Sequence, residues 1–210
     1  MSLRVAVLVS GEGTNLQAIL DSVHGREGIE VVGVGASKPQ ARGLERARAA
    51  GVATASFAAA DYAGRPERDA AMAEWLDSLG TELVVLAGFM EILSAGFIRH
   101  FSGRIINVHP SLLPAFSGIR AIEQALEHGV RLTGVTVHFV DEGVDTGPIV
   151  LQRAVELSYP ARIEAIEDRI HAVEHELLPR AVRLIAAGRV RVDPGNPRRV
   201  LIEEDGDDDG

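Results

Sequence analysis

A nearly continuous apolar segment, Leu3–Val9, leads directly into a glycine-rich turn at residues 10–15 and then into a helix-forming segment at 16–21. Apolar strands with little polar interruption are typical of parallel sheets that are buried on both faces. A strand, a turn and a helix in this order require a neighbouring parallel strand, which the apolar residues 29–34 supply. The start of the chain therefore predicts a βαβ unit.

Strands and helices continue to alternate along the remaining sequence. We expect a weaker strand at 53–57, further strands at 83–86, around 105, at 133–140 and 149–155, and a last one at 190–192. Helices are expected at 43–50, 65–79, 121–126 and 162–187. This alternation predicts the α/β class, with a Rossmann-like, mostly parallel sheet flanked by helices. Residues 1–189 are expected to form one domain, because no linker or internal repeat divides them.

The composition of the 210-residue chain excludes several classes of protein. The absence of cysteine rules out a disulfide framework and thiolate chemistry. A net charge of −9 argues against a nucleic-acid surface, and no apolar run is long enough to span a bilayer. We expect a cytoplasmic protein, a monomer or homodimer, that acts on small molecules. Residues 190–210 are expected to form an extension that ends in a disordered acidic tail.

The turn at 10–15 has the composition of an anion site. Glycine-rich turns between a strand and a helix present backbone N–H groups and a helix N-terminus to a phosphate. Leu16 stands where a dinucleotide-binding G-x-G-x-x-G motif has its third glycine, and no Gly-Lys-Ser/Thr follows, so neither a dinucleotide nor a P-loop nucleotide is expected. Gly13, Thr14 and Asn15 are candidates for binding a single phosphate; the alternative is a turn that only reverses the chain.

A polar pair follows the apolar strand near residue 105. Asn107 and His109 are two residues apart, so their side chains lie on the same face of an extended backbone. An amide N–H can donate to a developing oxyanion, and an imidazole can deliver a proton near neutral pH. The pair is therefore a candidate catalytic site. A strand end capped by polar residues, with a hydrogen-bonded histidine, is the equally weighted alternative.

Other strand-end loops are expected beside this pair. Right-handed crossovers place the loops after parallel strands at one edge of the sheet, so the loops after Val9, Leu86, Asn107 and Val140 should meet. The loop after Leu86 is apolar at residues 90, 92 and 93. It could line a pocket for a flat ring, or its side chains could simply be core.

The last predicted helix contains His171-Ala-Val-Glu174-His175, which matches the H-x-x-E-H pattern of inverzincin metallopeptidases. His171 and His175 would share a helix face, but zinc needs a third protein ligand, and the residues that follow offer only the acidic tail. We therefore expect no metal. Glu174 is better explained as a hydrogen-bond partner for a substrate amine or hydroxyl, or as part of a solvated helix face.

Six short motifs within about residues 3–187 can be considered together. They are Ser10-Gly-Glu-Gly-Thr-Asn-Leu-Gln-Ala18, Leu86-Ala-Gly-Phe-Met90, Asn107-Val-His-Pro-Ser-Leu-Leu-Pro114, Gln124-Ala-Leu126, Thr136-Val-His-Phe139 and Asp145-Thr-Gly-Pro148. Together they resemble the phosphoribosylglycinamide formyltransferases, a branch of the formyl-folate transferases and hydrolases. The resemblance implies formyl transfer from 10-formyltetrahydrofolate to the amine of 5-phosphoribosylglycinamide in purine biosynthesis. It also implies a nucleotide-binding half at about 1–100 and a folate-binding, catalytic half at about 101–189.

The resemblance also assigns roles to individual residues. The implied catalytic set is Asn107, His109 and Asp145. The residues implied to bind the ribonucleotide are Gly13, Thr14, Asn15, His171, Ala172, Val173 and Glu174. The residues implied to bind folate are Arg65, Met90, Glu91, Ile92, Leu93, Asn107, Asp141, Glu142, Gly143, Val144 and Asp145. Two positions depart from the family pattern, because Glu91 replaces a frequent basic residue and Ile122 a frequent histidine.

The implied mechanism needs neither a nucleophilic side chain nor a metal, because the substrate amine attacks the formyl carbon. Asn107 and a protonated His109 would donate to the oxyanion, and Asp145 would favour the charged imidazole. Two other functions remain open: a 10-formyltetrahydrofolate hydrolase, with water in place of the amine, and a non-catalytic nucleotide-binding module. The intact catalytic set argues against the module.

Overall fold

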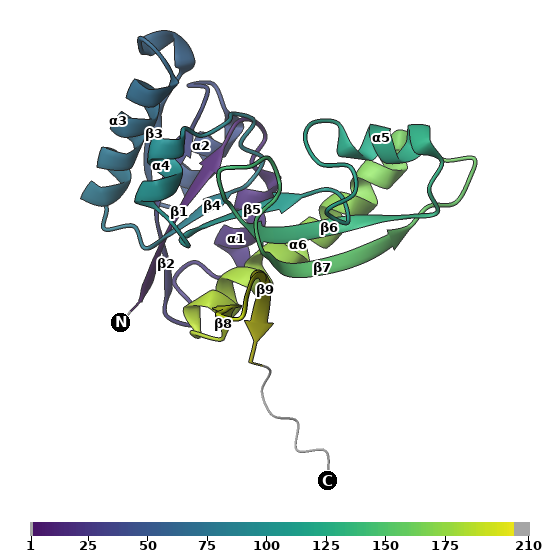
Figure 1. The fold of residues 1–210 in the computed structure, drawn as a ribbon. Helices are drawn as coiled ribbons and strands as arrows, with labels where there is room; N and C mark the ends of the chain where they lie inside the picture. Colours follow the sequence, from purple (N-terminus) through teal and green to yellow (C-terminus); the bar gives the residue numbers. More distant parts are fainter. Residues whose placement is uncertain (1, 204–210) are drawn as a thin grey trace.

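A computed structural model describes residues 2–203 and shows a seven-stranded sheet covered on both faces by helices (Figure 1). Its order is β3-β2-β1-β4-β5-β6-β7. The strands are β1 Leu3–Val9, β2 Ile29–Ala36, β3 Ala53–Ser56, β4 Leu83–Leu86, β5 Ile105–His109, β6 Leu132–Phe139 and β7 Ile149–Glu156. Pairing is parallel from β3 through β5 and antiparallel from β5 through β7, which confirms the α/β class with a mostly parallel sheet.

The helices agree with the sequence prediction in all but one case. They are α1 Thr14–Ser22, α2 Arg42–Ala49, α3 Arg65–Ser78, α4 Ala95–His100, α5 Ala121–His128 and α6 Ile163–Ala186, with a short 3₁₀ turn, η1, at Ala59–Asp61. Helix α4 was not expected, because its six residues are too few to show a helical period. Its start is marked by Ser94, whose hydroxyl accepts a hydrogen bond from the Phe97 N–H at 3.3 Å.

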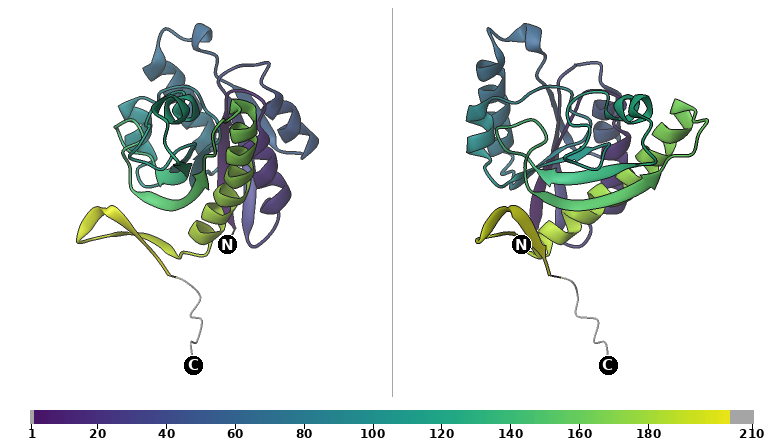
Figure 2. Two further views of the ribbon diagram at one scale, coloured as in Figure 1. Left: turned by 90° about the vertical axis from the view of Figure 1, so that its right-hand side faces the viewer. Right: turned by 45° about the vertical axis from the view of Figure 1, so that its right-hand side comes forward.

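Both faces of strand β1 are buried, which accounts for its nearly continuous apolar sequence. Val5, Val7 and Val9 pack in a core that includes α1, α2 and α6, whereas Ala6 and Leu8 pack in a second core with α3 and α4. Figure 2 shows these two helical layers from the side. The first core draws on elements from β1 to α6, so the two halves expected from the sequence share it. The division at about residue 100 stays a prediction.

Strand β6 departs from the expected parallel arrangement. It runs antiparallel to β5, with Phe139 opposite Ile106 and Thr136 opposite His109. The end of β6 therefore lies at the other edge of the sheet from the ends of β1, β4 and β5, and the reason given for placing the loop after Val140 beside the other loops is wrong. That loop instead turns back, and the return brings Asp145 to His109.

The C-terminal extension forms a two-stranded antiparallel hairpin outside the main sheet, with β8 at Val190–Asp193 and β9 at Asn196–Ile202 (Figure 1). Only the first of these strands was expected. Residues 204–210 of the predicted acidic tail lie outside the described residues. Within residues 2–203, none of the helices has the length and hydropathy needed to cross a membrane.

Candidate active site

The turn after β1 is built to bring the backbone close to a ligand. Gly13 precedes α1 with φ 70°, in the left-handed region that glycine tolerates best. A side chain there would also collide with the chain, because an added Cβ would lie 2.7 Å from the Cα of Gly43. Thr14 is exposed at the first turn of α1, and Asn15 beside it is buried. These features leave the start of α1 open to an anion.

This turn lies at the topological switch point of the sheet, between β1 and β4. The Ser10 hydroxyl joins the loops on either side. It accepts a hydrogen bond from the Met90 backbone N–H at 2.8 Å and another from the Ser37 hydroxyl at 2.7 Å. The candidate phosphate turn and the apolar loop after β4 are therefore neighbours, as expected from the sequence.

Glu174 connects α6 to the start of α1. Its Oε2 accepts a hydrogen bond from Asn15 Nδ2 at 2.9 Å, and its residue is only 5% exposed. Burial raises the pKa of the Glu174 carboxyl, which the Asn15 amide and the charge on His171 offset only in part. The Oδ1 of Asn15 is buried without a hydrogen-bond partner, so this pair retains an unused acceptor near the turn.

The other residues of the predicted 171–174 segment are less buried than Glu174. His171 and Ala172 are exposed, and Val173 is half-buried. The rings of His171 and His175 lie 6.4 Å apart between centroids and nearly parallel. Within residues 2–203, no three His, Cys, Asp or Glu side chains are grouped so that they could hold a metal ion.

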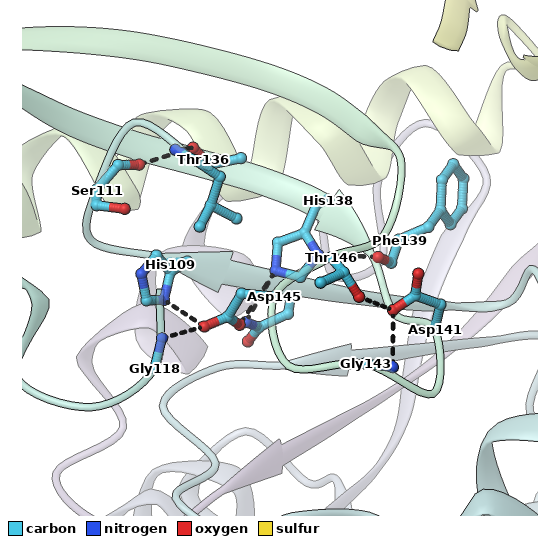
Figure 3. Close-up of polar contacts among 12 residues, drawn as sticks. His109, Ser111, Gly118, Thr136, His138, Phe139, Asp141, Gly143, Asp145 and Thr146 are labelled. Carbon is cyan, nitrogen blue, oxygen red and sulfur yellow. Dashed lines mark hydrogen bonds and ion pairs between the residues drawn. The ribbon is translucent and has the colours of Figure 1, made fainter. Parts of the chain in front are cut away.

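The side chains of His109, His138 and Asp145, which come from β5, β6 and the return loop after β6, lie close together (Figure 3). Asp145 Oδ2 lies 3.4 Å from His109 Nδ1, and its Oδ1 lies 3.6 Å from His138 Nε2. Asn107 Nδ2 is 3.2 Å from the same His138 nitrogen. The structure thus brings together the predicted set of Asn107, His109 and Asp145 and adds His138 to it.

Asp145 is held as an anion at this position. Burial alone raises the pKa of the Asp145 carboxyl. The His138 ring, whenever its Nε2 carries a hydrogen, the Gly118 N–H and the charge that His109 can carry together lower it by more, so the pKa lies below its usual range. Gly118 N donates to Asp145 Oδ2 at 2.7 Å. Asp145 itself has φ 54°, a left-handed conformation that Asp and Asn tolerate better than other non-glycine residues.

Both ring nitrogens of His109 have partners. Nε2 lies 2.9 Å from the backbone oxygen of Phe116, which can only accept, so this nitrogen carries a hydrogen. Nδ1 faces the Asp145 carboxylate. Each ring nitrogen therefore faces an oxygen that can accept a hydrogen bond. The loop containing Phe116 thus holds the ring N–H that would serve a substrate oxygen.

The loop after β4 is divided between surface and core. Met90 is 76% exposed and Ile92 is 61% exposed, whereas Leu93 is buried. The core alternative therefore holds for Leu93 only, and the two exposed apolar side chains are free for a ligand.

Hydrogen bonds to the carboxylate of Asp141 hold the loop after β6 in one conformation. Asp141 Oδ1 accepts hydrogen bonds from the Gly143 N–H at 3.1 Å and from the Thr146 hydroxyl at 2.6 Å (Figure 3). Glu142 and Val144 are exposed. A Cβ at Gly147 would lie 1.8 Å from the Phe139 oxygen, so the tight return of this loop requires glycine. These contacts fix the path that carries Asp145.

A buried arginine that the sequence analysis did not single out supports the loop after β4. Arg68 is 2% exposed, and its guanidinium donates to Asp69 Oδ1 at 2.8 Å and to Glu91 Oε2 at 3.0 Å. Glu91, which departs from the family pattern, thus balances the charge of Arg68 together with Asp69. Arg65, the predicted folate contact, is exposed at the start of α3. Apolar spacing could not reveal Arg68, because its burial depends on Asp69 and Glu91.

His138 is the second functional candidate that the sequence analysis did not name as a site residue. The available signal was its position two residues after Thr136 on one face of the predicted strand. Thr136 is buried, and its hydroxyl donates to the Ser111 oxygen at 2.7 Å and accepts from the Leu113 N–H at 3.1 Å. Strand β6 therefore both anchors the turn after β5 and supplies His138.

Comparison with known proteins agrees with this geometry. The family described as "Formyl transferase" matches residues 3–182, and the chain therefore belongs to the formyl transferase family. Within that family the sequence is 40% identical over 190 residues to the phosphoribosylglycinamide formyltransferase of Haemophilus influenzae, a match that covers 90% of each chain.

Two further relatives define the extent of the similarity. The crystal structure of glycinamide ribonucleotide transformylase 1 from Symbiobacterium toebii is 48% identical, with a TM-score of 0.92 and coverage of 97% of this chain and 95% of that one. The trifunctional purine biosynthetic protein adenosine-3 of Bos taurus is 43% identical over 203 residues. That match covers 96% of this chain but only 20% of the bovine protein, so the chain spans about a fifth of this relative.

Proposed function

We propose that this protein transfers the formyl group of 10-formyltetrahydrofolate to the amine of 5-phosphoribosylglycinamide, giving formylglycinamide ribonucleotide and tetrahydrofolate in purine biosynthesis. The observation that carries the proposal is the cluster of Asn107, His109 and Asp145 at the end of β5. Two relatives named for this activity support the proposal, since they are 40% and 48% identical to the chain.

The cluster suits attack by a substrate amine rather than by a side chain. The Ser111 hydroxyl, two residues after His109, donates to the Ala115 carbonyl at 2.6 Å and does not contact the imidazole. A Ser–His nucleophile is therefore not assembled here. The remaining groups are an amide, an imidazole and a carboxylate, which can bind an oxyanion and move a proton.

In the proposed mechanism, the substrate amine adds to the formyl carbon and negative charge develops on the formyl oxygen. Asn107 donates an N–H to that oxygen, and His109 donates Nε2–H. The attacking nitrogen loses one proton to water. His109 then gives a proton to the folate nitrogen as the bond between that nitrogen and the formyl carbon breaks, a form of acid catalysis that typically contributes about 10²–10⁴-fold. The imidazole regains its proton from water. Asp145 keeps the imidazole charged and oriented through Nδ1.

The structure adds one requirement to this mechanism. His109 Nε2–H is bonded to the Phe116 carbonyl, so the formyl oxygen must take the place of that carbonyl. The loop between β5 and α5 therefore has to move the Phe116 carbonyl away from His109 during each turnover. Phe116 has φ 53°, a left-handed conformation that is strained for an aromatic residue and favours such a change.

The two substrates occupy opposite sides of the cluster in this proposal. The ribonucleotide phosphate binds the N–H groups at Gly13, Thr14 and Asn15 together with the Thr14 hydroxyl, and its ribose or amine is near Glu174. The folate ring lies against the exposed apolar loop at 90–93 and the braced loop at 141–145. Arg65, which is exposed at the start of α3, is free to reach an anionic part of the folate.

One assay separates this function from its nearest rival. Purified protein with 10-formyltetrahydrofolate is expected to produce tetrahydrofolate only when 5-phosphoribosylglycinamide is present, with equal amounts of formylated ribonucleotide and little free formate. Formate release at the same rate without the ribonucleotide would identify a hydrolase. Binding of the ribonucleotide without turnover of the folate would identify a non-catalytic module.

Thr14 offers a direct test of the phosphate turn. Thr14→Val removes the hydroxyl but keeps the shape of an exposed side chain at the start of α1. Because hydrogen bonds to charged groups contribute about 1.5–3 kcal/mol, the KM for 5-phosphoribosylglycinamide is expected to rise roughly 10-fold or more. The kcat should change little, as measured by steady-state kinetics.

Ser22→Ala, at the other end of α1, is the matched control and should leave this KM unchanged. An unaltered KM in Thr14→Val would remove the hydroxyl from the proposed phosphate site, whereas a lower kcat at constant KM would place Thr14 nearer the reacting atoms.

A further inference from the structure

His138 contacts Asn107 in a way that determines how the Asn107 amide points. The two residues are directly opposite each other in the β5–β6 pair, and His138 is only 2% exposed. Directly opposite side chains on one face of an antiparallel pair are in reach of each other. The contact joins Asn107 Nδ2 and His138 Nε2 at 3.2 Å.

The hydrogen positions on the His138 ring follow from its other contact. Nδ1 lies 2.8 Å from the backbone oxygen of Phe139, and a carbonyl oxygen can only accept, so Nδ1 carries a hydrogen. In the neutral ring Nε2 then has a free lone pair. That lone pair accepts one of the two hydrogens on Asn107 Nδ2, which leaves the second for another partner.

We infer that His138 is a positioning residue for the proposed reaction, which sets the Asn107 carboxamide so that its free Nδ2–H faces the formyl oxygen. An asparagine amide can otherwise rotate by half a turn and present an oxygen, which would repel an oxyanion. His138 removes this alternative because its Nε2 accepts only from the nitrogen side of the amide. The inference rests on the proposed function, since it acts through Asn107.

The orientation of the Asn107 amide depends on whether Nε2 of the His138 ring carries a hydrogen. The other titratable group that faces Nε2 is Asp145, whose Oδ1 is 3.6 Å away, beyond hydrogen-bond distance, and Asp145 in turn pairs with His109. The β7 residue opposite His138 is the uncharged Ile149. A proton on Nε2 would turn this nitrogen toward Asp145, end its contact with Asn107 Nδ2 and leave the amide free to rotate.

The first test compares two substitutions of His138. His138→Phe keeps a ring but has no acceptor, and His138→Gln offers an uncharged oxygen near the position of Nε2. We expect His138→Phe to lower kcat about 10-fold or more with little change in the KM for the ribonucleotide, because the amide loses its fixed orientation. His138→Gln should recover most of this loss.

A double substitution separates action through Asn107 from other roles. In an Asn107→Ala background, His138→Phe should cost almost nothing further, because the group that it positions is absent. A full, independent loss in that background would overturn the inference, as would equal losses in His138→Phe and His138→Gln. His100→Phe, at the exposed end of α4, is the control for histidine replacement and should leave kcat unchanged.

A measurement without substrate keeps the inference separate from the proposed function. Nitrogen-15 NMR of the whole protein near pH 7.5 should show a protonated Nδ1 and an unprotonated Nε2 for His138, and His138→Phe should shift the Asn107 side-chain amide signals. A His138 ring with its hydrogen on Nε2 would refute the orientation argument even if formyl transfer is observed. Expected NMR signals without formyl transfer would instead contradict only the proposed function.

Discussion

Replacing Asn107 with alanine is expected to lower kcat by about 10²–10³-fold, the usual cost of removing one oxyanion donor. In the inferred arrangement Asn107 keeps one free Nδ2–H, because it donates its other amide hydrogen to His138 Nε2, 3.2 Å away. This donor matters most when charge develops on the formyl oxygen, so its loss should reduce kcat and kcat/KM together. The KM for 5-phosphoribosylglycinamide should change little, because the phosphate turn is built from other residues.

Steady-state kinetics with both substrates varied would measure this effect. Asn196→Ala, in the hairpin between β8 and β9, is the matched control because it removes an asparagine far from the cluster in sequence. Activity of Asn107→Ala within a few-fold of the wild type would contradict the assignment. A large rise in KM at constant kcat would instead make Asn107 a binding residue.

Replacing Asp145 with asparagine is expected to be at least as costly, with a kcat loss of roughly 10²–10⁴-fold through the impaired acid role of His109. Asparagine tolerates the left-handed backbone at this position and can still accept from the Gly118 N–H. The substitution therefore removes mainly the negative charge beside His109. Alanine would be a poorer test, because it would also strain the loop.

Asp145→Asn should also change how stability depends on pH. A folded-state pKa below the usual value of 3.8 means that the charged carboxylate is favoured by folding. Its stabilisation is present at neutral pH and is lost as the pH falls through the folded-state pKa. The wild type should therefore be more stable than the variant near pH 7, and the difference should narrow below about pH 4.

Urea unfolding at several pH values measures this difference, and kinetics at neutral pH give the catalytic effect. Asp193→Asn, in the C-terminal hairpin, serves as the control for removing one carboxylate. A variant with full activity would show that His109 does not need the carboxylate. A stability difference that widens toward low pH would contradict the lowered pKa of Asp145.

The start of the chain, where a strand, a turn and a helix follow one another, shows how much of the fold local sequence patterns predict. The apolar run of β1 predicts burial on both faces, and the structure confirms it with separate cores on each side. Helix α4 and strand β9 were not predicted. One is too short for a period, and the other is a largely exposed hairpin strand whose pattern reports little burial.

The direction of β6 in the sheet is set by the tertiary structure and not by its local sequence. Its sequence, Leu132–Phe139, is apolar enough for either a parallel or an antiparallel strand. Strand direction depends on how the chain returns through α5, and no local pattern specifies that path. The prediction that Asp145 lies near His109 was therefore right in outcome but wrong in the reason taken from parallel strands.

The sequence by itself determined the class of fold, the glycine turn before α1 and the pair Asn107 and His109 on one strand face, because these depend on spacings of a few residues. Only the tertiary structure decided which groups those residues contact. It placed His138 against Asn107, the Phe116 carbonyl against His109, and Glu91 against Arg68. The physical reason is that ring tautomer, amide orientation and charge pairing depend on partners distant in sequence, which only the folded chain brings within hydrogen-bond distance.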